Sequence, residues 1–158
     1  MQGGRAETTP IRLSSRGGAN AVAGLAVVIG DLQVGVTHKY PIAAELVPRA
    51  AALAAAARKR GHLVVFVRTQ LRANGSDVSA QNAGVHAIYD MNDDYHQGST
   101  GVELDPGRGR APGDVVVTKR RASAFAGTDL DVVLRCNGVG MLVVAGSRDE
   151  RDGGRNGL

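Results

Sequence analysis

PGDVVVTKRRASAFAGTDL, residues 112–130, combines a short apolar run, a basic turn and the start of a helix. The run of three valines is typical of a strand that is covered on both faces of a parallel sheet. Thr128 lies three residues before Asp131, which is the spacing of a capping box at a helix N-terminus. A further apolar run, Met141–Ala145, follows Gly138, a helix stop. The stretch therefore predicts a strand, a helix and a second strand.

Two similar apolar runs lie upstream, at Leu25–Ile29 and Leu63–Val67. Between them, an alanine-rich segment predicts a helix over Pro48–Arg60, with Pro48 tolerated in its first turn and Gly61 as its stop. Because strands and helices alternate, we expect an α/β fold with a mainly parallel sheet and right-handed crossovers.

The chain has 158 residues, which suits one domain with a sizeable core. Alanine and valine dominate its 43% of apolar residues, and it has no tryptophan and two phenylalanines. This composition fits alanine-rich helices on a valine-rich sheet and excludes an aromatic base-stacking surface. The formal net charge is only +4, and the basic cluster at residues 119–121 is typical of a solvated loop. We therefore expect no nucleic-acid partner.

A single cysteine, Cys136, excludes an intramolecular disulfide and suits a reducing compartment. The segment Ala19–Gly30 is apolar and has arginines upstream, but it is too short to span a bilayer, and Asp31 follows at once. A buried strand accounts for this segment better than a signal peptide does. We therefore expect a cytoplasmic protein with no membrane partner.

The sequence divides into three parts. Residues 1–20 have no apolar period and predict a flexible leader, residues 21–146 form the predicted α/β domain, and residues 147–158 alternate in charge and predict a polar tail. Within the domain, Arg72–Arg110 is mostly polar and loop-like, with one short helix near Val85–Tyr89. Such a segment inside an α/β domain is typical of a substrate-side excursion.

Three charged residues, Asp31, Arg68 and Lys119, follow predicted strands. In an open parallel sheet, ligands bind outside the carboxyl ends of the strands. An Asp–Lys pair at that edge is a candidate for moving protons during catalysis. The same two residues would also fit a structural ion pair or a helix-capping contact at the sheet edge. Their spacing leaves both interpretations open.

Metal ligation has little support in the sequence. The four histidines are scattered and include no pair at metal-binding spacing, and the glycines form no phosphate loop. We therefore expect no metal and no cofactor. Cys136 lies near the end of the predicted helix, at the opposite end of the next strand from the candidate site, which favours a small buried helix residue over a nucleophile.

Three segments carry a resemblance to a known family: AVVIGDLQ at 26–33, the lysine segment at 113–130, and MLVVAG at 141–146. They resemble the opening strand, the lysine region and the strand before the nucleophile loop of the isochorismatase-like, or cysteine hydrolase, superfamily. The resemblance implies a three-layer α/β/α fold, with Asp31 as the acid/base and Lys119 as the cation that stabilises charged forms. The substrate contacts that we expect beside this pair are Gln33, Arg68, Ser123 and Phe125.

In the amide hydrolases of this superfamily a cysteine attacks the substrate carbon, whereas some members lack it and cleave the vinyl ether of isochorismate. The resemblance places the nucleophile six residues after Gly146, where this chain has Asp152. Read in a frame shifted by one base, the codons possible for residues 147–158 permit Leu-Ala-Thr-Ser-Gly-Thr-Val-Val. That segment is similar to the branch of the family without the cysteine. We therefore expect a frameshift after Gly146 and a domain truncated at its C-terminus.

The resemblance implies a hydrolase of a small molecule that cleaves an amide or carbamoyl C–N bond or an isochorismate-type vinyl ether, and that is impaired because the nucleophile segment is missing. The alternative is a catalytically inactive scaffold or small-molecule-binding remnant of the same fold. A sheet that ends with the strand at 141–145 would present an unpaired apolar edge, so we expect a homo-oligomer.

Overall fold

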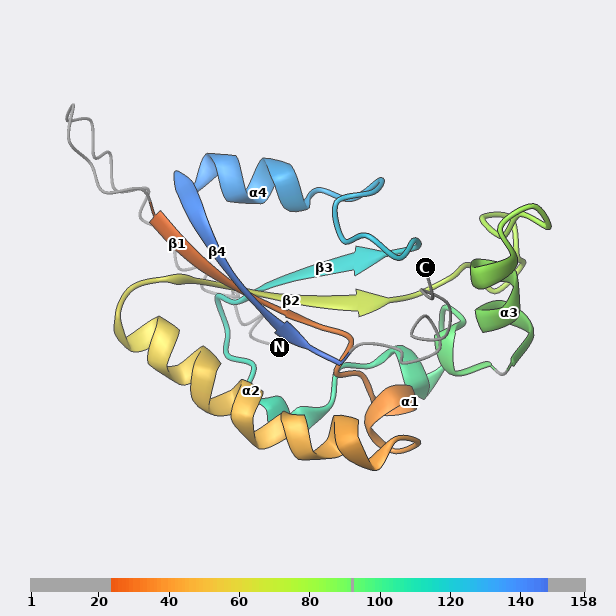
Figure 1. The fold of residues 1–158 in the computed structure, drawn as a ribbon, viewed down its shortest axis with the longest axis horizontal. Helices are drawn as coiled ribbons and strands as arrows, with labels where there is room; N and C mark the ends of the chain where they lie inside the picture. The colour runs from red at the N-terminus through yellow and green to blue at the C-terminus, as the bar shows by residue number, and fades with distance from the viewer. Residues whose placement is uncertain (1–23, 92, 148–158) are drawn as a thin grey trace, which may run out of the picture.

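The computed structural model describes residues 24–91 and 93–147. Its four parallel strands form one sheet in the order β3-β2-β1-β4 (Figure 1). The strands are β1 (Gly24–Gly30), β2 (Leu63–Thr69), β3 (Val115–Lys119) and β4 (Val139–Gly146). The expected α/β fold with a parallel sheet is confirmed. The predicted leader, and all of the predicted tail except Ser147, lie outside the described residues.

Helices cover both faces of the sheet, which gives the three layers that the resemblance implied (Figure 1). α2 (Pro41–Lys59) packs its alanines on the face where Phe66 is buried. α4 (Leu130–Cys136) packs on the other face, where Val67 is buried. Because side chains alternate along a strand, neighbouring residues of one strand serve opposite cores.

Helix α2 begins earlier than the sequence predicted. Pro41 occupies its first turn, where a missing N–H costs nothing, and Pro48 lies inside the helix. The prediction that Pro48 starts the helix was therefore wrong. A buried stripe at helical spacing continues across Pro48, so burial against the sheet outweighs the hydrogen bond that the proline removes. This stripe consists of Ala43, Val47, Ala50, Ala54 and Ala57.

Helix α4 begins where the sequence predicted it, with part of the expected cap. The Thr128 hydroxyl oxygen accepts a hydrogen bond from the backbone N–H of Leu130 at 3.2 Å. Asp131 does not complete a capping box, because its carboxylate pairs with Arg135 at 2.7 Å one turn further on. Gly138 follows the helix with a φ of 62°, the left-handed conformation that ends many helices.

Much of the polar segment after β2 lies beyond the carboxyl ends of the strands, and its last part, residues 106–108, packs against α2 (Figure 1). Two isolated bridges attach it there, an antiparallel one between Gln33 and Leu104 and a parallel one between Leu71 and His96. The predicted short helix is present as α3 and is longer than expected. The helices in this region are α1 (Val34–Thr37), α3 (Ala83–Met91), η1 (Asp93–Tyr95), η2 (Thr100–Val102) and η3 (Pro106–Arg108).

Arg108 is a buried charge that the sequence did not reveal. Its side chain lies in the α2 core with its guanidinium over the Phe66 ring, 4.9 Å from the ring centroid. Nη1 donates a hydrogen bond to the Leu32 carbonyl at 2.6 Å, while Nε has no hydrogen-bond partner among the described residues. Burial lowers the pKa of Arg108 to about 10.

Strand β4 forms one edge of the described sheet and is its most exposed part. Met141, Leu142, Val143 and Val144 are 61%, 38%, 38% and 73% exposed, whereas the core residues of β1 are buried. Cys136, just before this strand, is also exposed, so the prediction of a buried cysteine was wrong.

Among the described residues, no helix is both long and apolar enough to cross a membrane.

Candidate active site

Asp31 leaves β1 in an unusual backbone conformation. Its φ is 59°, in the left-handed region that residues other than glycine seldom adopt, and aspartate is one of the residues that adopt it most readily. The Asp31 N–H donates to the Val67 carbonyl of β2 at 3.0 Å, which fixes this turn against the neighbouring strand. A conformation of this kind, held by its surroundings, is common at functional sites.

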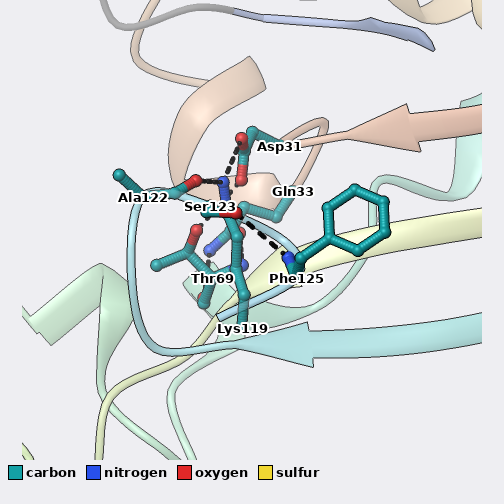
Figure 2. Close-up of polar contacts among 7 residues, drawn as sticks. All are labelled: Asp31, Gln33, Thr69, Lys119, Ala122, Ser123 and Phe125. Atoms are coloured by element: carbon teal, nitrogen blue, oxygen red, sulfur yellow. Dashed lines mark hydrogen bonds and ion pairs between the residues drawn. The ribbon is translucent and has the colours of Figure 1, made fainter. Parts of the chain in front are cut away.

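Lys119, the last residue of β3, reaches across the end of β2 to Asp31 (Figure 2). Its Nζ donates to Asp31 Oδ2 at 2.8 Å and to the Ala122 carbonyl at 3.1 Å. The lysine side chain is 11% exposed and the aspartate side chain is 28% exposed. The ammonium is therefore largely enclosed, while the carboxylate stays within reach of a small molecule from solvent.

Thr69, the last residue of β2, holds the second carboxylate oxygen. Its hydroxyl donates to Asp31 Oδ1 at 2.9 Å. Sequence reasoning missed this residue, although Thr69 and Lys119 are register partners at the ends of β2 and β3. One signal in the sequence could have found it. Thr69 is a polar residue at the end of a strand, and we expected charged residues, Asp31 and Lys119, at the ends of two other strands.

Gln33, a predicted substrate contact, is completely buried behind this site. Its Nε2 donates to the carbonyls of Thr69 at 3.1 Å and Gly101 at 3.2 Å, and its Oε1 accepts the Thr69 N–H at 2.9 Å. The side chain therefore joins the exit of β1 to the end of β2 (Figure 2) and also to η2 through Gly101. This geometry favours a positioning role, and contact with substrate stays a prediction.

Arg68 is not brought together with the Asp31–Lys119 pair. It precedes Thr69 in β2, so its side chain belongs to the opposite face of the sheet. There its Nε donates to the Thr118 hydroxyl at 3.2 Å, and its Nη1 lies 3.6 Å from Glu103 Oε1. Contact between Arg68 and substrate stays a prediction.

Ser123 and Phe125 lie in the turn that follows Lys119, next to the pair (Figure 2). Ser123 is exposed, and its hydroxyl oxygen accepts the Phe125 N–H at 3.2 Å. The Phe125 side chain is among the large exposed apolar groups, at 50% exposure. Contact of either residue with substrate stays a prediction.

The described residues contain no group of three or more histidine, cysteine or acidic side chains that could hold a metal ion. The single thiol, Cys136, is at the end of α4 and belongs to neither of the two segments that build the pair. The position that the resemblance assigns to the nucleophile, Asp152, lies outside the described residues.

Comparison with known proteins places the chain in a family. The isochorismatase domain matches residues 25–148, which include nearly all of the described sheet. The chain belongs to the isochorismatase family. It is similar to YwoC of Bacillus subtilis, an uncharacterized isochorismatase family protein, with 35% identity over an alignment of 129 residues, and the match covers 77% of this chain and 61% of YwoC.

Solved structures of other proteins share the fold. A cysteine hydrolase from Pseudomonas syringae pv. phaseolicola superposes with a TM-score of 0.68 at 27% identity, over 78% of this chain and 59% of that protein. N-carbamoylsarcosine amidase from Thermoplasma acidophilum superposes with a TM-score of 0.64 at 26% identity, over 78% and 67%. The chain thus spans about three fifths of the length of YwoC and of the cysteine hydrolase.

Proposed function

We propose that the Asp31–Lys119 pair is the catalytic centre of a small-molecule hydrolase. The observation that carries this proposal is the 2.8 Å contact between a partly exposed carboxylate and a largely enclosed ammonium, at the carboxyl edge of a parallel sheet. Family membership supports hydrolysis as the reaction class. The similarity to N-carbamoylsarcosine amidase supports an amide or carbamoyl C–N bond as the target, and an isochorismate-type vinyl ether is the other bond we propose to test.

The two side chains have different roles in this proposal. Asp31 accepts a proton from the attacking water and returns it to the leaving atom, so water is added across the broken bond with no net change in protons. Lys119 holds the carboxylate in place and stabilises negative charge as it develops on the substrate. Thr69 fixes the rotation of the carboxylate through its second oxygen. Water is the nucleophile in this proposal, because the described segments that carry Asp31, Thr69 and Lys119 contain no thiol.

The full chain should be tested against amides, carbamoyl compounds and isochorismate. Replacement of Asp31 by Asn or of Lys119 by Met is expected to lower turnover by about 10²–10⁴-fold, the usual contribution of a general acid–base group. Asp129→Asn, an exposed aspartate at the start of α4, is the matched control and should retain turnover. Unchanged turnover in Asp31→Asn would refute the assignment.

A second candidate function is a small-molecule-binding scaffold without turnover. The observation that favours it is the position of Cys136, which is exposed at the end of α4 and lies in neither of the described segments that carry the pair. Calorimetry with the same compounds distinguishes the two functions. Binding that depends on Asp31 and is not followed by product would support the scaffold.

A further inference from the structure

A second carboxylate, Asp77, lies next to the segment that carries Lys119 and has no part in the proposed chemistry. Its side chain is only 6% exposed, although it belongs to a polar loop. Oδ1 and Oδ2 accept the backbone N–H of Arg72 at 3.1 and 3.2 Å. A carboxylate is costly to bury without such compensation, so its place in the loop is specific.

Two arginines converge on Asp77. Oδ2 lies 3.0 Å from Nε of Arg120 and 3.6 Å from Nη1 of Arg72. The contact with Arg120 is an ion pair by distance, and its N–H is not aligned for a hydrogen bond. Charge attraction depends less on direction than a hydrogen bond does, so this pair can hold the arginine while small rearrangements occur around it.

The position of these arginines connects Asp77 to the candidate site. Arg120 directly follows Lys119, and Arg72 lies three residues after Thr69. Lys119 and Thr69 are the two side chains that hold the Asp31 carboxylate. The segments that follow β2 and β3, which supply the two partners of Asp31, therefore both contact Asp77 as well.

The turn after Lys119 needs such an anchor. The Lys119 ammonium is held by the carbonyl of Ala122 in this turn as well as by Asp31, while Ala122 and Ser123 are themselves exposed. An exposed turn with few buried side chains opens easily. Arg120 is the residue of the turn whose side chain pairs with a nearly buried group, namely Asp77.

We propose that Asp77 is a positioning residue that anchors the turn after Lys119 through Arg120 and so keeps the Lys119 ammonium on the Asp31 carboxylate. This inference rests on the proposed function of the Asp31–Lys119 pair. Asp77 itself pairs with Arg120 and Arg72, and it acts on the site through the backbone that carries Lys119.

The test is the ¹⁵N signal of the Lys119 ammonium in the full chain at low temperature. An ammonium held by two acceptors exchanges slowly with water and gives a cross-peak, whereas the exposed Lys39 and Lys59, which are the other two lysines, exchange quickly. We expect Asp77→Asn and Arg120→Gln each to abolish this cross-peak.

Asp114→Asn is the matched control. Asp114 is a comparably buried carboxylate, 4% exposed, that pairs with Arg58 at 2.9 Å just before the start of β3, away from the site. The cross-peak should survive in this variant. Arg120→Gln alters a one-third exposed side chain and therefore tests the same contact even if Asp77→Asn fails to fold.

Turnover provides a separate readout, in which we expect Asp77→Asn to lower kcat and leave KM unchanged. If the parent chain shows no turnover, the proposed function fails, and the cross-peak still tests the anchor. The inference would be overturned if the parent chain gave no Lys119 cross-peak. It would also be overturned if both Asp77→Asn and Arg120→Gln retained the cross-peak, or if Asp114→Asn lost it to the same extent.

Discussion

Gln33 and Thr69 exchange hydrogen bonds across the ends of β1 and β2. The Gln33 carboxamide donates to the Thr69 carbonyl at 3.1 Å, and the Thr69 N–H donates back to it at 2.9 Å. The Gln33 side chain thus bonds the backbone of β2 just beyond Gly30, where the backbone of β1 no longer pairs with it. Because the Thr69 hydroxyl holds Asp31, the glutamine also fixes one partner of the candidate catalytic carboxylate.

Replacement of Gln33 by Leu should destabilise the chain by about 1–3 kcal/mol, since the Thr69 N–H and the Gly101 carbonyl would lose buried hydrogen bonds. Urea unfolding followed by circular dichroism measures this loss. Gln81→Leu, at an exposed glutamine, should change the free energy of unfolding by less than about 0.5 kcal/mol. Equal effects of the two substitutions would show that the Gln33 bonds contribute nothing.

Thr69→Val should lower turnover with little change in fold. Valine keeps the shape of threonine but cannot donate to Asp31 Oδ1, so the carboxylate loses one of its two side-chain partners. We expect about a tenfold fall in kcat, equivalent to about 1.4 kcal/mol, the scale of a hydrogen bond to a charged group. Thr118→Val, one strand away on the opposite face, is the control and should leave kcat unchanged.

The stability of the chain should depend on Arg108 in alkaline solution. Because burial lowers the pKa of Arg108 to about 10, the unfolded chain holds this proton more tightly than the folded chain does. Stability therefore rises with pH through this group once the pH exceeds about 10. Arg108→Met removes the effect, so the free energy of unfolding of the parent relative to this variant should increase from about pH 9 to about pH 11. A difference that stays constant or decreases over this interval would contradict the prediction.

Association between copies should depend on the exposed edge strand. Val144→Lys places a charge on β4, a common means by which proteins prevent edge strands from pairing, and should lower the associated fraction in sedimentation velocity. Val132 on α4 is 60% exposed, against 73% for Val144, but lies away from the edge. Val132→Lys should therefore leave association as it was. A parent chain that is monomeric at high concentration would refute the expected homo-oligomer.

The sheet was predictable from the sequence because its inner strands are buried on both faces. A continuous apolar run such as Leu63–Val67 is typical of a strand inside a parallel sheet, and β2 contains it. Pro48 was misread because local propensity suggested a helix start, whereas burial of the stripe on both sides of it sustains one continuous helix. Cys136 was misread because its usual preference for the interior gave no information about an exposed helix end.

The candidate site was only half predictable. Asp31 and Lys119 could be expected to converge, because the carboxyl ends of parallel strands meet at one edge. Their partner Thr69 and the anchor at Asp77 depend on the path of loops, which composition does not encode. Arg68 shows the limit most clearly, because a shift of one residue along a strand moves a side chain to the other face of the sheet.

The left-handed backbone at Asp31 limits the amino acids that mutation can place there. Asparagine and glycine, each reachable from an aspartate codon by a single base change, tolerate this conformation, whereas a β-branched residue would be strained. The easiest replacements therefore remove the carboxylate without straining the backbone of the turn. On the proposed function, a lineage can lose catalysis at this position without losing the fold, and its descendants persist as stable proteins that only bind.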